Sequence, residues 1–208
     1  MGGSRPSRRL LLRKRKLWDL VICDFDDTLF PTTELLQYGL GAESVKKQIL
    51  TQFEPYLLRF AWWAYHHAHH VAIVTNASEG WVEGCLKQCM PRLWNYVQRV
   101  GWSIRSARSQ FEHQYPPNAY VGWKRSGILA EIHSTERRLH KKNTKLLFIA
   151  DGPVDKIAFD SFGLERKQMI QMIVRPSFHQ LVREWKQLTQ GKEKRFLYPQ
   201  KRQVFSLS

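Results

Sequence analysis

The sequence predicts an α/β fold built around a doubly wound, mainly parallel sheet of five strands. Two observations carry this prediction: short apolar runs recur along the chain, and stretches with the apolar spacing of a helix separate them. Nearly continuous apolar runs are typical of parallel strands that are buried on both faces. Their alternation with helices indicates a single sheet with helices on both sides.

The five apolar runs have strand length and are followed by polar residues or by proline. They span residues 17–23, 71–75, about 102–106, 145–150 and 169–174. In a doubly wound sheet, ligands bind beyond the carboxyl ends of the strands. Asp24, Thr75 and Asp151 lie at such ends, so we expect their side chains to meet at one edge of the sheet.

The stretches between the strands have the spacing of amphipathic helices. Residues 43–53 should place four apolar side chains on one face, and Pro55 should open a second helix with its own inward face. The inward residues are expected to be Val45, Ile49, Leu50 and Phe53, then Leu57, Phe60, Ala61 and Ala64. Residues 79–100, 126–140 and 178–188 supply the remaining helices, which completes a Rossmann-like α/β arrangement.

Length and charge divide the chain into three parts. The 208 residues, 43% of them apolar, suit one domain with a substantial core. The net charge of +15 lies mostly at the ends: residues 1–16 carry seven bases and no acid, and residues 183–202 carry seven bases and two acids. We therefore expect a basic, disordered arm at 1–16, a folded domain at 17–190 and a basic tail at 191–208. Basic ends favour targeting, or contact with RNA, DNA or an acidic membrane face.

Other features limit where the protein works. No apolar run reaches the roughly 18 residues that a membrane-spanning helix needs, so no transmembrane segment is expected. Three cysteines cannot form a disulfide framework, and the N-terminus does not resemble a secretory signal. These features favour an intracellular protein of the cytoplasm or nucleus, with import into an organelle left open.

A concentration of acids follows the first predicted strand. The segment reads Asp24-Phe25-Asp26-Asp27-Thr28, and two carboxylates this close repel each other unless a cation or a proton intervenes. The alternative is an acidic turn in which Asp27 caps a helix and Asp24 is solvated. Three further features follow in the chain: the apolar strand that ends in Thr75-Asn76, the isolated Lys124, and Asp151 with Asp155 in a D-x-x-x-D pattern.

Together these segments resemble the four motifs of the haloacid dehalogenase superfamily of phosphohydrolases. DFDDT, VTN, Lys124 and IADGPVD occur in the order and spacing of that superfamily, over about residues 17–176, although Ala150 replaces a frequent Gly or Asp. The resemblance implies a magnesium-dependent phosphatase that hydrolyses phosphomonoesters through an aspartyl-phosphate, with residues 17–190 as its catalytic domain. The intervals 28–71 and 76–124 are too short for a sizeable cap domain, so a capless member is expected.

The resemblance also implies a role for each motif residue. Asp24 would be the nucleophile, Asp26 the general acid and base, and Lys124 the group that balances charge. Thr75 and Asn76, with Lys124, would bind the phosphate. Mg²⁺ would be held by Asp24, the Asp26 backbone carbonyl, Asp151 and Asp155. The alternatives are that Thr75 simply ends a strand and that Lys124 is a surface lysine, with Arg125 as a competitor for its role.

Capless members of that superfamily often act on phosphorylated macromolecules, so the resemblance implies a phosphoprotein or a nucleic-acid end in preference to a small metabolite. In the segment 105–118, Arg105, Arg108 and His113 are candidate substrate contacts, unless this segment is only a solvated loop. The competing function is a non-catalytic or regulatory polyanion-binding protein on the same fold. Asp26 argues against it, because a binding protein does not need that acid.

The remaining histidines, cysteines and tryptophans are expected to be structural. The HHAHH tract at residues 66–70 lacks a neighbouring acid or cysteine that would complete a metal site. Cys85 and Cys89 have the spacing of core residues on a helix. Trp62-Trp63 and Trp94 should belong to the core or cover the sheet, with base-stacking platforms as the alternative.

Overall fold

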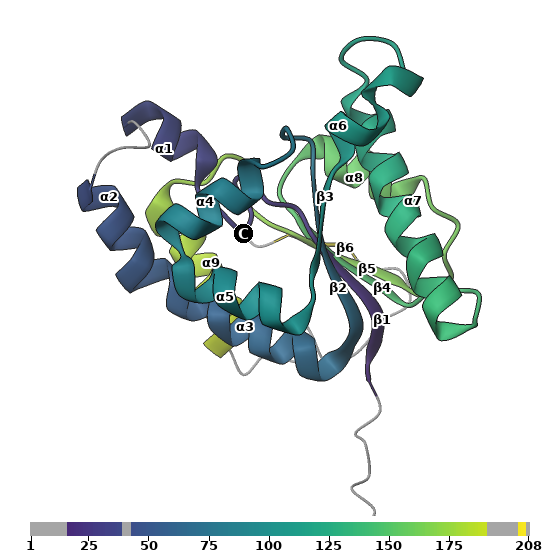
Figure 1. The fold of residues 1–208 in the computed structure, drawn as a ribbon, viewed down its shortest axis with the longest axis horizontal. Helices are drawn as coiled ribbons and strands as arrows, with labels where there is room; N and C mark the ends of the chain where they lie inside the picture. The colour runs from purple at the N-terminus through teal and green to yellow at the C-terminus, as the bar shows by residue number, and fades with distance from the viewer. Residues whose placement is uncertain (1–15, 39–42, 191–203, 207–208) are drawn as a thin grey trace, which may run out of the picture.

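The computed structural model describes residues 16–38, 43–190 and 204–206, which form an all-parallel sheet between two layers of helices (Figure 1). The predicted α/β, doubly wound class without a large cap is confirmed. The sheet order is β3-β2-β1-β4-β5-β6. The strands are β1 (Trp18–Cys23), β2 (Ala68–Thr75), β3 (Ser103–Ser106), β4 (Leu146–Ala150), β5 (Lys167–Gln171) and β6 (Val204–Ser206).

The strand order places the site-bearing ends of β1 and β4 side by side. From β1 the chain adds β2 and β3 on one side, and then crosses over to add β4 and β5 on the other. The order therefore reverses between β1 and β4, where a doubly wound sheet leaves a crevice at its carboxyl edge. Asp24 directly follows β1 and Asp151 directly follows β4, so both acids lie at this crevice.

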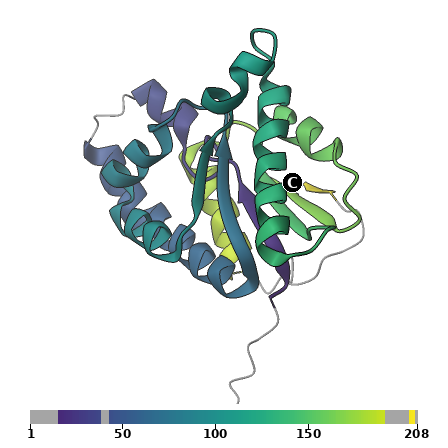
Figure 2. The ribbon, with the colours of Figure 1, turned by 45° about the vertical axis from the view of Figure 1, so that its right-hand side comes forward.

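One face of the sheet is covered by the larger helical layer (Figures 1 and 2). Its helices are α1 (Thr32–Tyr38), α2 (Glu43–Gln48), a π-helical turn (Ile49–Phe53), α3 (Glu54–His67), α4 (Trp81–Cys89), α5 (Pro91–Val100) and α9 (Phe178–Gln190). Apolar side chains of α1, the π-helical turn, α3, α4, α5 and α9 pack with Trp18, Val21 and Cys23 of β1 into one core.

The other face is covered by α6 (Ala107–Phe111), α7 (Tyr120–Leu139) and α8 (Pro153–Asp160), with a 3-10 turn (Glu112–Gln114) after α6. Leu20 and Ile22 of β1 point into this second core. Side chains of a strand alternate between its faces, so an uninterrupted apolar run such as β1 supplies both cores.

The predicted helix over 43–53 is interrupted. The turn at 49–53 is π-helical, and its wider hydrogen-bonding step rotates the following side chains relative to an α-helix. Ile49 and Phe53 are buried as predicted, but Leu50 is 36% exposed, so its predicted inward position is wrong. The side chain of Val45 lies outside the described residues. In α3 all four predicted inward residues are buried.

Other boundaries differ from the predictions for local reasons. The stretch 79–100 forms two helices, because Pro91 starts α5 after a non-helical Met90. Helix α7 begins at Tyr120, six residues before the predicted start. Strand β5 ends at Gln171, because the backbone N–H of Ile173 donates to Glu184 instead of extending the ladder.

The predicted structural residues are mostly where expected. Cys85 and Cys89 are buried in the core as free thiols, and Trp63 and Trp94 pack against that core. Trp62 is 57% exposed, so the expectation that it belongs to the core is wrong. Its side chain lies on the solvent side of α3, opposite the four apolar residues that face the sheet.

The two basic ends lie largely outside the described residues. Of the arm at 1–16 only Lys16 is described, and of the tail at 191–208 only β6, which pairs with β5 and adds a short sixth strand to the five predicted. None of the described helices is both long enough and apolar enough to cross a bilayer.

Candidate active site

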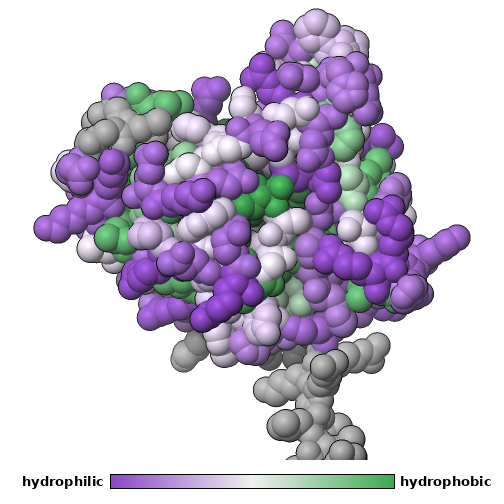
Figure 3. All heavy atoms as spheres, in the orientation of Figure 1, coloured by the Kyte–Doolittle hydropathy of each residue, from purple (hydrophilic) through white to green (hydrophobic). Residues whose placement is uncertain are grey.

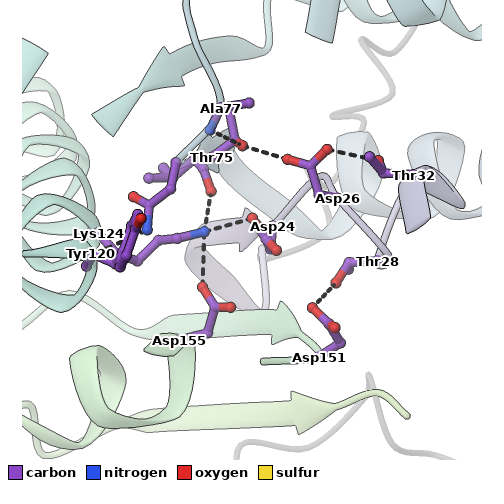
Figure 4. Close-up of polar contacts among 12 residues, drawn as sticks. Asp24, Asp26, Thr28, Thr32, Thr75, Ala77, Tyr120, Lys124, Asp151 and Asp155 are labelled. Carbon is purple, nitrogen blue, oxygen red and sulfur yellow. Dashed lines mark hydrogen bonds and ion pairs between the residues drawn. The ribbon is translucent and has the colours of Figure 1, made fainter. Parts of the chain in front are cut away.

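Asp24 and Lys124 form the centre of the candidate site (Figure 4). The Asp24 backbone N–H donates to the carbonyl of Ile149 at 2.9 Å, which ties the end of β1 to β4. Lys124, in the first turns of α7, places its Nζ 2.6 Å from Asp24 Oδ1 and donates to the carbonyl of Val74 at 3.0 Å. The Lys124 residue is only 2% exposed, so the alternative of a surface lysine does not hold.

Two further carboxylates converge on this pair. Asp155 lies in the first turn of α8, and its Oδ1 is 2.8 Å from Lys124 Nζ. Asp151 follows β4 and accepts a hydrogen bond from the hydroxyl of Thr28 at 3.3 Å. One oxygen from each of Asp24, Asp151 and Asp155 lies within 4.8 Å of the others, and all three residues are buried. We call these three residues the acidic cluster.

The acidic cluster carries more negative charge than Lys124 balances. Burial raises the pKa of Asp24 well above its usual range; Lys124 opposes this shift, and the neighbouring carboxylates add to it. Burial also raises the pKa of Asp151 to about 6, with Asp155 and Asp27 contributing. For Lys124, burial alone would lower the pKa, but Asp155 and Asp24 outweigh it and raise the pKa. A bound cation would relieve this repulsion.

The chemistry of the donors indicates which cation fits. All three side chains offer carboxylate oxygens, and no thiolate or imidazole belongs to the cluster. Hard oxygen ligands in small number suit Mg²⁺, which retains waters and takes one or two carboxylates together with a substrate phosphate. The residues present therefore fit the magnesium ion that the resemblance implies.

Asp26 points away from the acidic cluster and is held separately. Its Oδ1 accepts hydrogen bonds from Thr32 Oγ1 at 2.7 Å and Trp81 Nε1 at 2.9 Å, and its Oδ2 accepts from Thr75 Oγ1 at 2.9 Å. Three donors fix the carboxylate in one orientation at the mouth of the site. Sequence reasoning missed Thr32 and Trp81, since neither belongs to a motif.

The turn that carries Asp26 is stabilised by its neighbour. Asp27 has a φ of 54°, in the left-handed region, where Asp is one of the few side chains tolerated. Its Oδ1 accepts the backbone N–H of Thr33 at 2.8 Å, which connects the turn to the start of α1. Asp27 therefore supports the loop and does not join the acidic cluster.

Thr75 and Asn76 connect β2 to the other parts of the site. The Thr75 hydroxyl donates to Asp26 and accepts the backbone N–H of Ala77 at 2.9 Å. The Asn76 side chain donates to the carbonyl of Tyr120 at 3.0 Å, which connects the β2 loop to the first residue of α7. Asn76 Oδ1 is buried and has no hydrogen-bond partner among the described residues, so it is poised to accept one.

The three predicted substrate contacts form their hydrogen bonds and ion pairs with side chains outside the acidic cluster. Arg105 is in β3, and its guanidinium pairs with the buried Glu131 at 2.8 Å. Arg108, in α6, pairs with Glu112 at 3.0 Å and lies 5.9 Å from the Trp123 ring centroid. His113 is exposed in the 3-10 turn. The segment 105–118 is thus partly helical, and its role in substrate contact stays a prediction.

Around the site the surface is notched and largely hydrophilic. Figure 3 shows the notch between the lobe that carries α1 and the projection that carries α6. A hollow of about 50 Å³ lies beside Thr75, and its lining includes Ser78, Glu79, Glu83 and Gln110. Of the residues of the candidate site only Thr75 lines this hollow, so it adjoins the acidic cluster and Lys124 without including them.

Helix α9 braces the site from behind, which sequence reasoning also missed. Glu184 accepts the backbone N–H of Ile173 at 3.1 Å, and Trp185 Nε1 donates to the carbonyl of Thr28 at 2.8 Å. The two loops braced in this way hold Asp151, through the Thr28 hydroxyl and the backbone N–H of Arg175. Burial raises the pKa of Glu184 to about 7.

Comparisons with known proteins give no match: no family model matches the chain, and the searches of curated proteins and of solved structures found none that does.

Proposed function

We propose that the protein is a magnesium-dependent phosphatase that hydrolyses phosphomonoesters through a phosphorylated Asp24. The observation that carries the proposal is the buried Lys124 ammonium, which lies 2.6 Å from Asp24 and 2.8 Å from Asp155. An ammonium held between a nucleophile and a metal-ligating carboxylate, beside an acid on a separate support, suits transfer of a dianionic group.

The acidic cluster is the proposed magnesium site. Asp24, Asp151 and Asp155 would hold the ion, with the backbone carbonyl of Asp26 as a fourth protein ligand. When bound, the ion supplies positive charge that suppresses repulsion between the phosphate and the attacking carboxylate. Thr28 and the Arg175 backbone keep Asp151 oriented for this role.

The chain's own groups account for both half-reactions. A carboxylate oxygen of Asp24 attacks phosphorus, and the bond from phosphorus to the alcohol oxygen breaks while Asp26 donates a proton to that oxygen. Asp26 then takes a proton from water, whose oxygen attacks the phosphorus and releases Asp24 and inorganic phosphate. Lys124 stays close to Asp24 throughout and balances its charge.

Thr75 and Asn76 are the proposed phosphate contacts. Thr75 now donates to Asp26 Oδ2, so its hydroxyl has to turn from Asp26 to a phosphoryl oxygen when substrate binds. That turn frees one oxygen of Asp26 for the leaving group and couples substrate binding to the release of the acid. The amide of Asn76 lies on the next residue of the same loop and is anchored at Tyr120.

The substrate class that we favour is a phosphorylated macromolecule, either a phosphoprotein or a phosphorylated nucleic-acid end. The described residues form no large cap domain over the carboxyl edge of the sheet, where the candidate site lies. A small metabolite would leave the reaction open to water, whereas a large substrate covers the site with its own surface.

A panel of phosphate esters tests this proposal. Sugar phosphates, nucleotides, phosphopeptides and 3′- or 5′-phosphorylated oligonucleotides would be assayed with Mg²⁺ and with EDTA. Asp26→Asn should slow alkyl phosphates more than aryl phosphates, because only poor leaving groups need much proton donation. Equal losses on both would exclude Asp26 as the leaving-group acid, and turnover that persists in EDTA would exclude the metal.

The competing proposal is a non-catalytic polyanion-binding protein. Its binding should weaken steeply with salt, because each phosphate contact releases counterions. Turnover of a small aryl phosphate should be nearly independent of salt. Binding with no turnover on any ester of the panel would favour this alternative.

A further inference from the structure

The solvent face of α3 carries large rings where a surface helix usually carries charges. Trp62 is 57% exposed and Tyr65 is 50% exposed, three residues apart. Arg59, Trp62 and His66 follow each other at spacings of three and four, so they form one stripe along the helix. The residues that face the sheet lie on the other side of α3, so the exposed rings are not needed for the core.

The rings on this stripe are already ordered. Trp62 and His66 have ring centroids 4.2 Å apart, and His66 and Tyr65 have centroids 5.1 Å apart in an edge-on arrangement. His66 Nδ1 donates to the carbonyl of Trp62 at 2.7 Å, which fixes the imidazole. A set of rings held in place loses little conformational entropy when a further ring stacks on it.

Cations surround these rings, and helix α5 extends the same surface. Lys16 donates to the carbonyl of Tyr65, and its ammonium lies 5.3 Å from the Tyr65 ring centroid. On α5 the guanidinium of Arg99 lies 5.3 Å from the Tyr96 centroid. Helices α3 and α5 pack against each other, with Tyr65 on α3 near Tyr96 on α5. Burial raises the pKa of Tyr96, and the nearby Tyr65 adds to that rise.

Carboxylates are missing from the exposed parts of both helices. The one acid in α3 and α5 is Glu54, which is fully buried, pairs with Arg92 at 2.7 Å and caps the start of α5 at Leu93. Among the described exposed large apolar residues, α3 and α5 contribute only Trp62 and Tyr65, with no aliphatic side chain. The surface thus combines rings with cations and lacks aliphatic anchors.

This surface lies far from the candidate active site. The N–H of Leu17, just before β1, donates to the carbonyl of His67 at the end of α3, at the amino edge of the sheet. Asp24 follows the carboxyl end of β1, and six strand residues separate the two edges by about 20 Å. In Figure 1, α3 and α5 lie side by side below the crevice.

We propose that this aromatic–basic face binds single-stranded nucleic acid. It consists of Lys16, Arg59, Trp62, Tyr65, His66, Tyr96 and Arg99. Exposed rings stack on unpaired bases and cations contact the phosphates, which is how proteins hold single strands. A membrane surface fits less well, because insertion into a bilayer relies on Trp together with aliphatic and Phe side chains.

The charge of the arm supports the same partner. Residues 1–16 carry seven bases and no acid, and this segment joins the folded domain at Lys16, on the aromatic–basic face. A nucleic-acid strand stacked on α3 would therefore lie close to Lys16, where this densely basic segment joins the folded domain. The face would supply the stacking contacts to bases, and the positive charge of residues 1–16 would attract the phosphate backbone whatever its sequence.

Fluorescence anisotropy with the full chain and labelled oligouridylate of about 20 nucleotides tests the proposal. W62A/Y65A should bind at least about 10-fold more weakly, since stacking on one ring is worth roughly 1–3 kcal/mol per base. The slope of log K against log salt should stay unchanged, because the substitutions remove no charge. Deletion of residues 1–15 should flatten that slope instead. Oligodeoxythymidylate in a parallel titration tells RNA preference from general single-strand binding.

Two controls make the result specific. W62F/Y65F keeps both rings and should retain binding, and I157A removes an equally exposed apolar side chain from α8 on the other layer and should bind as the wild type does. The unfolding midpoint should stay the same in all variants. Wild-type affinity in W62A/Y65A, or equal affinity of the wild type for duplex and single strand, would overturn the proposal. Binding of W62A/Y65A to anionic vesicles would be measured in parallel. If this variant lost binding to vesicles but kept binding to oligouridylate, the proposal would be overturned in favour of a membrane.

Discussion

Helix α7 carries two buried charges seven residues apart, and their surroundings have opposite balance. Lys124 is one base that faces Asp24 and Asp155, with Asp151 close behind. Glu131, two turns further along the same side, is one acid that receives three donors. These donors are His70 Nε2 at 3.0 Å, Ser103 Oγ at 2.9 Å and Arg105 Nε at 2.8 Å.

The pKa shifts express the difference. Burial would raise the pKa of Glu131, but the bonds from His70 and Arg105 outweigh it and lower the pKa to about 2. Around Lys124 the carboxylates outnumber the base, and the pKa of Asp151 rises to about 6. Burial is common to both charges. The unbalanced surroundings of Lys124 are where we propose that a cation and a phosphate bind, whereas the balanced network around Glu131 stabilises the fold.

The largest expected effect is the loss of turnover when Asp24, beside Lys124, is replaced. Asp24→Asn should lower turnover by about 10⁴-fold or more, because it removes the proposed nucleophile. The unfolding midpoint should be unchanged or higher, because one of the crowded carboxylates becomes neutral while Lys124 keeps Asp155. Steady-state kinetics and thermal unfolding of the same preparation check this. Normal turnover by an uncontaminated Asp24→Asn protein would remove the mechanism.

Glu131→Gln should show the reverse pattern, a loss of stability with little change in turnover. It leaves His70 and Arg105 with a weaker partner in a buried place and should cost about 2–4 kcal/mol of unfolding free energy. Turnover per folded molecule should stay within about twofold, since Glu131 contacts none of the proposed catalytic groups. Urea unfolding measures the change in unfolding free energy. Steady-state kinetics well below the unfolding temperature measure turnover per folded molecule. A loss of turnover without a loss of stability would mean that the Glu131 network and the Lys124 site are coupled through α7.

The destabilisation by Glu131→Gln should depend on pH with a definite sign. The folded pKa of about 2 lies below the usual value of 4.5, so the ionised Glu131 adds stability above about pH 4.5. That stability disappears as the pH falls through 4.5 toward 2. Urea unfolding of wild type and variant at pH 7, 4 and 3 should therefore show a shrinking difference. A constant difference over this range would mean that packing, not charge, is responsible.

Asp151→Asn should show the opposite sign and a smaller effect. The folded pKa of about 6 lies above the usual 3.8, so ionised Asp151 costs stability that is fully felt above about pH 6 and vanishes below about pH 4. Without added metal the variant should be about 1–2 kcal/mol more stable at pH 7.5 and indistinguishable from wild type near pH 4. Addition of Mg²⁺ should raise the wild-type unfolding midpoint more at pH 7.5 than at pH 5, and EDTA should reverse the rise. No midpoint shift with Mg²⁺ at pH 7.5 would exclude the proposed metal site.

The smallest effect is expected at an exposed ion pair. Arg108 and Glu112 are four residues apart, and Arg108 Nε lies 3.0 Å from Glu112 Oε2. Both side chains are about half exposed. Glu112→Gln should change the unfolding free energy by no more than about 0.5 kcal/mol. It is the matched control for Glu131→Gln, since the same chemical change is made to an arginine-paired acid in solvent. A cost comparable to that of Glu131→Gln would show that burial does not decide the value of these pairs.

The sequence predicted those parts of the molecule that depend on local pattern. Strands β1 and β4 are buried on both faces, so their apolar runs and the acids after them, Asp24 and Asp151, stand out in the sequence. Lys124 has no local signal of its own, with Arg125 beside it, and only the resemblance to the ordered motifs indicated it. The contact that fixes Asp26 through Trp81 joins residues 55 positions apart and leaves no local signal.

The missed features have local and tertiary causes. Leu50 is exposed because a π-helical turn changes the helical register, and Trp62 is exposed although tryptophan is usually mostly buried. The balanced network at Glu131 joins two strands and a helix, so no window of the sequence contains it. Helix α9 was predicted as an element, but its bonds to Thr28 and Ile173 depend on packing across the whole chain.

The brace from α9 has a consequence for how the protein is made. Trp185 reaches back over 157 positions to Thr28, so the first motif to leave the ribosome is supported by the last helix. At about 5–20 residues per second, the acidic cluster is complete in sequence a few seconds before its support exists. A nascent chain that stops before α9 would carry every proposed catalytic group, but the loops of Thr28 and Ile173 would lack their bonds to Trp185 and Glu184. The support of the site is therefore the last part of it that the ribosome delivers.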